Sequence, residues 1–159
     1  MYTLGVNASH HSSIALLKDN EVVLFVLEER LNRQKHCGGI PTKALGLVKN
    51  ITNFIDCVVV GGGEPMQKAV ISRLERYGVC VKSAITKQKS HHLFHASAGF
   101  YMSHFDEASC LVIDGSGSGE DFITQTKTLK ANETTSIYEV NYPNKFNCTY
   151  KNYTVGVYD

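Results

Sequence analysis

The feature that most constrains the fold is a series of strand-like segments joined by very short polar turns, which occurs twice. Near the N-terminus, apolar segments cover residues 2–8, 12–19 and 21–29, separated by NASHHSS (residues 7–13) and by an Asp-Asn pair. Connections this short leave no room for a crossover, so neighbouring strands are expected to be antiparallel. The pattern begins again after residue 106, where EASCLVIDGSGSGEDFITQTKTL predicts strand, glycine turn and strand, and TTSIYEVNY predicts a third strand.

Between the two meanders, the sequence predicts an alternation of helices and strands. A continuous apolar run at 54–63 ends in glycines and is typical of a buried parallel strand. Pro65 suits the first turn of the following helix, and Gly78 suits its end. Thr42 and Ser90 are the expected N-caps of the other two helices. The predicted order is helix 43–52, strand 54–63, helix 65–78, strand 79–85 and helix 90–103.

This order predicts an α/β chain with a duplicated plan. Paired turns rich in serine or glycine, each between the first two strands of a lobe, are the layout of the actin-like ATPase superfold (ASKHA, RNase H-like). Residues 1–105 are expected to form a first lobe with a mixed five-stranded sheet, and residues 106–159 the first strands of a second, incomplete lobe. The terminal NYTVGVYD supplies no helix to cover the open sheet, so a fragment or one half of a split protein is expected.

Composition and charge narrow the function classes. Of 159 residues, 43% are hydrophobic and the formal net charge is +1, which indicates a globular protein without a strongly basic surface. No apolar run reaches the roughly 18 residues of a membrane span, and the N-terminus predicts a strand instead of a signal peptide. The five cysteines are scattered without C-x-x-C spacing. This favours reduced thiols and a cytoplasmic location, or the host cytoplasm for a phage protein.

The segment KSHHLFHASAGFYM places three histidines within five positions at the start of a predicted helix. His91 and His95 are four residues apart and share one helix face, whereas His92 lies about 100° around the helix. Asp114 ends the strand CLVID and can add a carboxylate. The resulting set of two histidines and one carboxylate suits Fe²⁺, Zn²⁺ or Mn²⁺. The alternative interpretation is a pair of exposed or capping histidines.

The two polar turns are candidate phosphate-binding loops. Backbone N–H groups and small hydroxyls in NASHHSS can contact phosphate, and Asn7 stands where many actin-like ATPases carry an aspartate for Mg²⁺. In DGSGSG, Gly115, Ser116 and Gly117 permit close approach of a ligand to the backbone. A plain β-hairpin turn is the alternative for each segment.

Two long blocks of the sequence resemble a known family. LGVNASHHSSIALLKDNEVVLFVLEERLNRQKHCGGIP and HHLFHASAGFYMSHFDEASCLVIDGSGSGE are similar to successive landmarks of the Kae1-like N-terminal domain of NodU/CmcH-type carbamoyltransferases. The resemblance implies ATP-dependent transfer of a carbamoyl group from carbamoyl phosphate, through carbamoyl-adenylate, to an acceptor hydroxyl. The YrdC-like domain that makes the adenylate in the family is absent from this sequence. The resemblance therefore implies a carbamoyltransferase that is inactive as this chain alone.

The resemblance also implies roles for individual residues. His91, His95 and Asp114 match the metal ligands of the family, which a further aspartate beyond residue 159 completes. His10 and His11 are alternative residues for binding the adenylate or taking the proton of the acceptor, and Mg²⁺ can accompany ATP. Lys35 would supply a cation for the phosphate or carbamoyl oxygen. Substrate or nucleotide contacts are expected from Asn7, Ser9, Ser12, Arg30, His36, His92, Gly115, Ser116 and Gly117. For His92, a role in supporting the metal ligands is the alternative.

The sequence leaves the acceptor and the assembly open. The acceptor hydroxyl can belong to a small molecule, a sugar or a modified nucleobase, although a net charge of +1 gives nucleic acid no support. A second hypothesis is one subunit of a split carbamoyltransferase, whose partner polypeptide carries the rest of the Kae1-like domain and the YrdC-like domain. A third hypothesis is an actin-like sugar kinase or ATPase, which the H-x-x-x-H spacing and Asn7 disfavour. No association with a membrane is expected.

Overall fold

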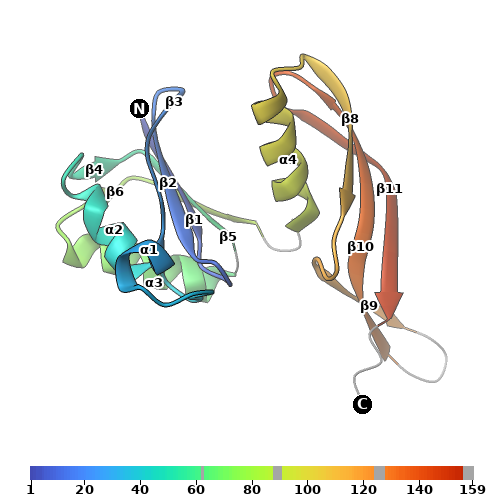
Figure 1. Ribbon diagram of the computed structural model, residues 1–159, viewed down its shortest axis with the longest axis horizontal. Coiled ribbons are helices and arrows are strands. Elements are labelled where there is room, and N and C mark those ends of the chain that lie inside the picture. The colour runs from blue at the N-terminus through green and yellow to red at the C-terminus, as the bar shows by residue number, and fades with distance from the viewer. Residues whose placement is uncertain (62, 88–90, 124–127, 156–159) are drawn as a thin grey trace. The chain divides into compact units, whose positions relative to one another are not determined.

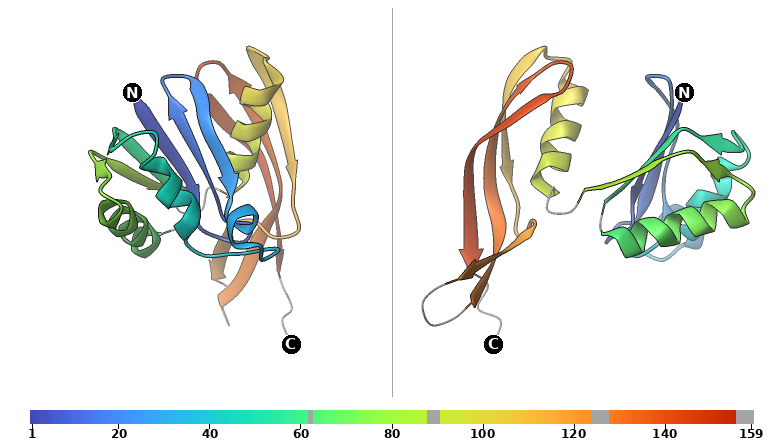
Figure 2. Two further views of the ribbon diagram at one scale, coloured as in Figure 1. Left: turned by 60° about the vertical axis from the view of Figure 1, so that its left-hand side comes forward. Right: turned by 180° about the vertical axis from the view of Figure 1, so that it is seen from behind.

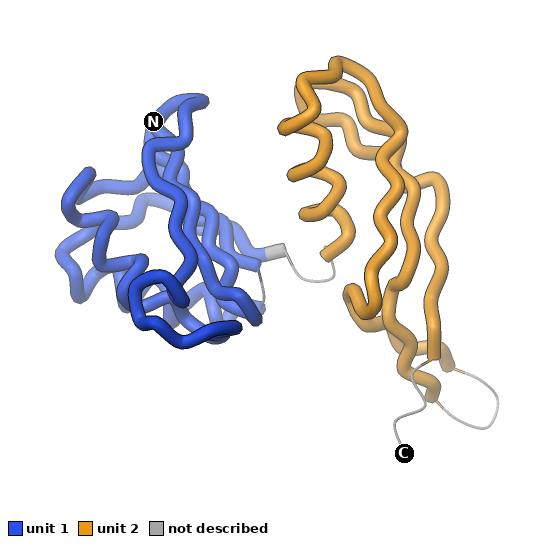
Figure 3. Tube along the Cα trace, viewed as in Figure 1, with its two compact units in different colours: residues 1–88 blue, residues 89–159 orange. Residues whose placement is uncertain are grey.

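The computed structural model describes residues 1–61, 63–87, 91–123 and 128–155. The chain divides into two compact units, Met1–Gln88 and Lys89–Asp159 (Figure 3). The helix that follows residue 90 therefore groups with the strands after it, whereas the predicted first lobe extended to residue 105. No helix within the described ranges is long and apolar enough to cross a membrane.

The first unit is built on a five-stranded sheet of order β3-β2-β1-β5-β7 (Figure 1). β1 (Tyr2–Asn7), β2 (Ser13–Lys18) and β3 (Glu21–Leu27) form the antiparallel meander that the short turns predicted. β5 (Cys57–Gly61) pairs in parallel with β1, and β7 (Ala84–Lys87) pairs in parallel with β5. The predicted α/β class and the mixed five-stranded sheet are confirmed.

Helices α1 (Glu28–Asn32), α2 (Thr42–Val48) and α3 (Glu64–Arg76) complete this unit, and α2 and α3 cover one face of the sheet (Figure 2). Alternation along the strands sends their apolar side chains to that face. Pro65 lies in the first turn of α3 and Gly78, with φ of +74°, follows its end, as predicted. The core of the first unit contains Leu4, Val6, Ile14, Leu16, Ala44, Leu45, Val48, Val58, Val60, Val70 and Leu74.

The start of α2 differs from the prediction. Pro41 is the N-cap and Thr42 is the first helical residue, because the Thr42 hydroxyl donates to a preceding backbone carbonyl (3.3 Å) instead of capping the helix. The buried carboxylate of Glu28 accepts the N–H groups of Lys43 (3.0 Å) and Ala44 (2.9 Å). A glutamate distant in sequence therefore satisfies the first turn of α2, which a local capping rule cannot detect.

The predicted parallel strand 54–63 and the predicted strand 79–85 are each split. β4 (Phe54–Ile55) pairs with β6 (Cys80–Val81) in a separate two-stranded parallel sheet, while β5 and β7 join the main sheet. Asp56 interrupts the first apolar run between β4 and β5. Its carboxylate accepts the N–H of Tyr2 (2.8 Å), and its carbonyl accepts the hydroxyl of Ser83 (2.7 Å). These bonds fix the chain at the point where it passes from one sheet to the other.

The second unit packs helix α4 (His91–Ser103) on one face of an antiparallel sheet (Figures 1 and 2). Ser90, expected as the N-cap of this helix, lies outside the described residues. The strands are β8 (Glu107–Ile113), β9 (Gly119–Ile123), β10 (Thr128–Asn141) and β11 (Lys145–Val155). The core between helix and sheet contains Ala96, Phe100, Val112, Tyr138 and Val140.

The glycine-rich segment DGSGSG does not form the predicted hairpin. Among the described strand pairings, β8 and β9 pair with β10 and not with each other. β8 pairs along Thr135–Asn141 and β9 along Thr128–Asn132, on the same edge of β10, while β11 occupies the opposite edge. The two strands are therefore successive parts of one long edge strand.

Residues 114–118 leave the line of this edge strand, and we call them the 114–118 excursion. These five residues stand opposite only Glu133 and Thr134, which lie between the two paired stretches of β10. The N–H of Asp114 donates to the carbonyl of Thr134 (2.9 Å), and the N–H of Gly117 donates to the carbonyl of Glu133 (2.8 Å). The excursion is therefore attached to β10 at both of its ends.

Candidate metal centre

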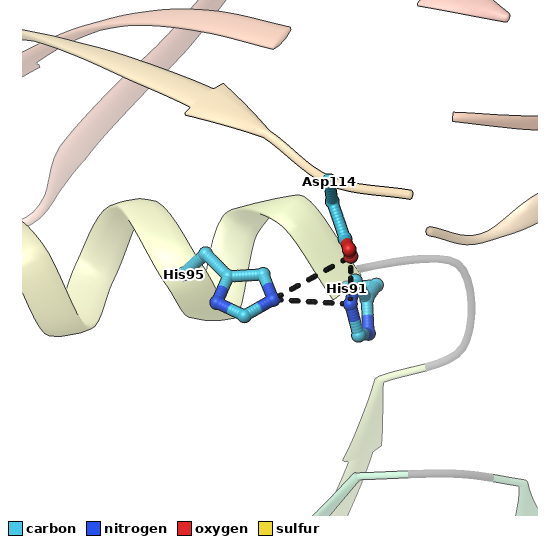
Figure 4. Close-up of side chains that lie close together, drawn as sticks. All are labelled: His91, His95 and Asp114. Carbon is cyan, nitrogen blue, oxygen red and sulfur yellow. Dashed lines mark hydrogen bonds and ion pairs between the residues drawn. The ribbon is translucent and has the colours of Figure 1, made fainter. Parts of the chain in front are cut away.

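His91, His95 and Asp114 converge in the second unit (Figure 4). The first turns of α4 present both histidines on one face, and the carboxylate follows the end of β8. Asp114 Oδ2 lies 2.6 Å from Nε2 of His91 and 3.7 Å from Nε2 of His95, and the two ring nitrogens are 3.0 Å apart. One ligand atom from each residue lies within 4.8 Å of the others, so the three can contact a single ion. Two imidazole nitrogens and one carboxylate oxygen fit Fe²⁺, Zn²⁺ or Mn²⁺.

Asp114 keeps its negative charge at neutral pH. Burial raises the pKa of its carboxyl group, but the hydrogen bond with His91 and the backbone N–H groups of Gly115 and Ser116 outweigh burial and lower the pKa below its usual value. An anionic carboxylate beside two imidazoles attracts a divalent cation. The negative charge of Asp114 and the nitrogen and oxygen ligand atoms of the three residues therefore both favour binding of a divalent metal ion.

A pocket of 390 Å³ opens beside His95 and Asp114, between α4 and β8. Its wall combines the polar side chains of His95 and Asp114 with apolar side chains, and the polar and apolar parts of the wall are nearly equal in extent. The other lining residues are Ala96, Gly99, Cys110, Leu111, Val112 and Ile113.

A line of hydrogen bonds leads from the candidate ligands into the sheet. The N–H of His91 donates to Oγ of Ser118 (3.2 Å), and the N–H of Ser118 donates to Oε2 of Glu133 (3.2 Å). Nζ of Lys151 forms an ion pair with Oε1 of Glu133, which is 1% exposed. None of the sequence patterns predicted this Ser118–Glu133–Lys151 line. One sequence feature does indicate it: Glu133 comes two residues after Ala131 in β10, and residues two apart in a strand lie on the same face. Because Ala131 is buried, Glu133 lies at an inward position.

Both members of the ion pair are charged at neutral pH. Burial raises the pKa of Glu133, but the hydrogen bonds from Lys151 and from the N–H of Ser118 outweigh burial and lower the pKa below its usual value. Burial alone would lower the pKa of Lys151, whereas its contact with Glu133 raises the pKa above the usual value. Glu133 and Lys151 therefore form a charged pair at neutral pH, beneath the 114–118 excursion.

His92 is fully buried, with Nδ1 at 2.7 Å from the hydroxyl of Ser136. Burial lowers the pKa of His92 more than the nearby Glu133 and Asp114 raise it, so the ring is neutral at neutral pH. No described atom hydrogen-bonds to Nε2, and a Cβ added at Gly117 would lie 2.7 Å from that nitrogen. Burial removes His92 from the predicted contact with substrate and favours a supporting role. Gly117 gives this ring its space, so it packs against protein where a phosphate contact was predicted.

Gly115 and Ser116, the other two residues of the excursion that were predicted to contact substrate or nucleotide, lie at the surface. Gly115 is exposed, and no described atom outside its immediate neighbours lies within 4 Å of a Cβ added there. The exposed Ser116 accepts a hydrogen bond from Nδ2 of Asn132 (2.9 Å). Both residues are therefore accessible beside Asp114.

In the first unit, the turn between β1 and β2 is held by its own side chains. Nδ2 of Asn7 donates to the carbonyls of His10 (3.1 Å) and His11 (3.2 Å), and Oδ1 of Asn7 accepts the N–H of Ser9 (3.1 Å). The hydroxyl of Ser9 lies 3.0 Å from Nδ1 of His10. The side chain of Asn7 therefore holds the turn in shape, whereas the sequence predicted a contact with substrate.

The segment after α1 packs against this turn. The hydroxyl and the N–H of Ser12 both donate to the carbonyl of Cys37, at 3.2 Å and 2.9 Å. Ser12 is 1% exposed, so it has no surface for the predicted contact with a ligand. His11 and His36 face each other, with Nε2 of His11 at 3.4 Å from Nδ1 of His36.

The predicted site residues thus form two groups, one in each unit. Arg30 and Lys35 extend from the first group into solvent, and the guanidinium of Arg30 lies 3.7 Å from the carboxylate of Glu29. The second group is the set of candidate metal ligands with the excursion beside it. The sequence motifs therefore identified the residues of each group, but not the hydrogen bonds that hold them.

The chain is a distant, partial relative of proteins from bacteria and archaea, although no protein-family model matches it. It is 28% identical over 134 residues to nodulation protein NolNO of Sinorhizobium fredii, covering 68% of this chain and 20% of that protein. It is 32% identical over 129 residues to the uncharacterized protein MJ1051 of Methanocaldococcus jannaschii, covering 76% and 23%. An alignment of 194 residues with the uncharacterized protein sll1178 of Synechocystis shows 25% identity and covers 96% and 31%. The chain thus spans less than one third of the length of these curated relatives.

Among solved structures, the type II variant of the Aquifex aeolicus Ppx/GppA phosphatase is similar with a TM-score of 0.34 and 12% sequence identity. The similarity covers 89% of this chain and 52% of the phosphatase.

Proposed function

We propose that this chain is the metal-binding part of a carbamoyltransferase and that it belongs to a Kae1-like domain of actin-like fold. The convergence of His91, His95 and Asp114 carries the proposal, because these residues match the metal ligands of the NodU/CmcH-type family. Similarity to a nodulation protein over 68% of the chain supports the same relationship.

The three ligands, with an aspartate from polypeptide beyond this sequence, would hold Fe²⁺ or Zn²⁺, with Mn²⁺ as a further alternative. The bound ion would supply positive charge that stabilises negative charge on carbamoyl or phosphate oxygens. Asp114 contributes a permanent negative charge, and the bond from the His91 N–H to Ser118 fixes the start of α4. The neutral ring of His92 supports this arrangement without adding a competing positive charge.

We assign the remaining chemistry to the first group of residues. In the tautomer in which the Nδ1–H of His10 donates to the hydroxyl of Ser9, Nε2 of His10 is left to accept the proton of the acceptor hydroxyl. Nε2 of His11 faces His36 instead, so His10 is the better candidate base. The exposed ammonium of Lys35 would bind a phosphate or carbamoyl oxygen.

The proposed substrates are carbamoyl phosphate, ATP and a hydroxyl on a small molecule, a sugar or a modified nucleobase. Because the chain covers 20% to 31% of its relatives, the activity is proposed for an assembly that contains the corresponding remainder. That remainder would include the last metal ligand and a YrdC-like domain, on the same polypeptide or on a partner.

The test is a transfer assay with labelled carbamoyl phosphate, ATP and a panel of hydroxyl acceptors, with metal content measured on the same assembly. The substitutions His91→Ala and His95→Ala should abolish both metal content and transfer. His104→Ala is the matched control, because His104 is exposed and lies just after the C-terminal end of α4. Undiminished transfer by the metal-free double variant would refute the metal role. Phosphoryl transfer from ATP without carbamoyl phosphate would support a kinase instead.

A further inference from the structure

We propose a second binding site for a divalent transition-metal ion, formed in the first unit by His11 and His36. His11 lies in the turn between β1 and β2, and His36 lies in the segment between α1 and α2. Nε2 of His11 and Nδ1 of His36 are 3.4 Å apart, and the ring planes cross at 82°. The two nitrogens are therefore close enough to contact one ion.

The distance between the two nitrogens suits ligands of one ion. Zinc–nitrogen bonds of about 2.0–2.1 Å at a tetrahedral angle place two imidazole nitrogens about 3.3–3.4 Å apart. Direct hydrogen bonds from N–H groups centre on about 2.9–3.0 Å, so 3.4 Å is long for such a bond. The observed separation of 3.4 Å therefore matches the spacing of two ligands of one ion, although it also allows a long hydrogen bond between the rings when no ion is bound.

The pair also repeats the arrangement of the candidate ligands in the second unit. The ring centroids of His11 and His36 are 4.8 Å apart, compared with 4.7 Å for His91 and His95. The interplanar angles are 82° and 79°, and the nitrogen separations are 3.4 Å and 3.0 Å. Two unrelated loops thus present imidazoles in the geometry that a turn of helix gives the H-x-x-x-H pair.

The backbone holds this arrangement before any ion binds. The N–H of Gly39 donates to the carbonyl of Ser9 (3.1 Å), which joins the two loops next to the histidines. Gly38 lies so close that an added Cβ would be 3.2 Å from the same carbonyl oxygen. The N–H of His36 donates to the carboxylate of Glu29 (3.0 Å), and both histidines have left-handed φ angles, 53° for His11 and 57° for His36.

The chemistry of the pair favours particular ions. Imidazole nitrogens bind Zn²⁺, Co²⁺, Ni²⁺ or Cu²⁺ and are poor ligands for Mg²⁺ and Ca²⁺. Both rings are exposed, so water or an anionic ligand can fill the other coordination positions. The carboxylate of Glu29, bonded to the backbone of His36, adds negative charge nearby. This site does not depend on carbamoyl transfer and is expected whether or not the proposed function is correct.

The experiment counts metal equivalents in the full chain. In a His91→Ala/His95→Ala background, Zn²⁺ titration followed by calorimetry should show one equivalent, assigned to the loop pair. His11→Asn and His36→Asn, which keep a residue tolerant of left-handed φ, should each raise the apparent Kd at least tenfold. His10→Asn is the matched control and should retain the equivalent, because Nδ1 of His10 is engaged by Ser9.

A second readout separates metal binding from loss of fold. Zn²⁺ should shift the ¹⁵N resonances of His11 Nε2 and His36 Nδ1 in the same background, while those of His10 stay in place. Absence of both the equivalent and these shifts would overturn the proposal, as would loss of binding in His10→Asn alone. A further outcome distinguishes the two proposals. If His11→Asn or His36→Asn removes one metal equivalent from the otherwise wild-type chain, whereas His91→Ala/His95→Ala removes none, this second site is supported and the metal role in the proposed function is contradicted.

Discussion

Removal of the positive charge beneath the 114–118 excursion should destabilise the second unit strongly. In Lys151→Met, the aliphatic stem is largely kept and the ammonium that pairs with Glu133 is lost. The carboxylate of Glu133, 1% exposed, would then keep only the N–H of Ser118 as a charge-assisted partner among the bonds described above. Without the ammonium of Lys151, most of the favourable interaction that compensates for burying the charged carboxylate is lost.

The expected loss can be estimated from the structure. Breaking a buried ion pair by removing one partner costs about 3–5 kcal/mol. Because the side chain of Lys151 is 30% exposed, water reaches the pair, and we expect the lower end, about 3 kcal/mol. Lys151→Met combined with Glu133→Gln removes both charges and keeps an acceptor for Ser118, so its loss should be about 1 kcal/mol. The double variant should therefore be more stable than Lys151→Met alone.

The contribution of Glu133 to the free energy of unfolding should depend on pH in opposite directions in the wild type and in Lys151→Met. In the wild type, the lowered pKa of Glu133 gives stability that is present above the unfolded pKa and lost as the pH falls through the folded value. In Lys151→Met, burial would raise that pKa, so the carboxylate costs stability near neutral pH and its protonation relieves the cost as the pH falls. The Glu133 contribution should therefore decrease on acidification in the wild type and increase in the variant.

The assay is urea unfolding followed by circular dichroism between pH 2 and pH 8, with amide hydrogen exchange in β10 to locate the change. Destabilisation should appear in the amides of β10 and β11 and leave those of β1 and β2 protected, since the pair lies wholly in the second unit. A Lys151→Met protein within about 0.5 kcal/mol of the wild type would refute the reasoning, because the pair would then be screened as at a surface. So would a double variant less stable than the single one.

Three further changes test other contacts. Gly117→Ala should cost about 1–3 kcal/mol by thermal unfolding, because its Cβ would overlap the buried ring of His92, whereas Gly115→Ala should be close to neutral; equal effects would contradict the packing role. Glu28→Ala should cost about 1–2 kcal/mol and Glu28→Gln less, since only the alanine leaves two N–H groups of α2 without an acceptor; no difference between them in urea unfolding would exclude the cap. Asp114→Asn should lower the affinity for Zn²⁺ at least tenfold by calorimetry, with unchanged affinity ruling out a charged ligand.

The sequence predicted those parts of the fold that depend on local pattern. Period-two alternation identified the first meander, and the H-x-x-x-H spacing with a strand-end aspartate identified the residues that converge in the second unit. The glycine-rich segment was assigned wrongly, because its residues suit a hairpin as well as an excursion. The choice depends on pairing with β10, which lies later in the chain. A local pattern cannot supply that partner.

The supporting contacts escaped prediction for the same reason. Glu28 caps a helix from 15 positions before it in the chain, and Glu133 depends on a lysine 18 positions away on β11. A charged residue at an inward position of a strand indicates that some partner exists, but not which one. Identification of Lys151 requires the register of β10 with β11, which includes an irregularity between Glu133 and Thr135.

The placement of the 114–118 excursion has a consequence for which changes of length the second unit can accept. The excursion already holds five residues opposite two, and the strands before and after it are paired independently to β10. One residue more between Gly115 and Ser116 would enlarge the excursion and leave both registers intact. One residue more in β10 after Glu133 would turn every following side chain to the other face and remove Tyr138 and Val140 from beneath α4. Natural variation in length should therefore collect in the excursion and avoid the strand that faces it.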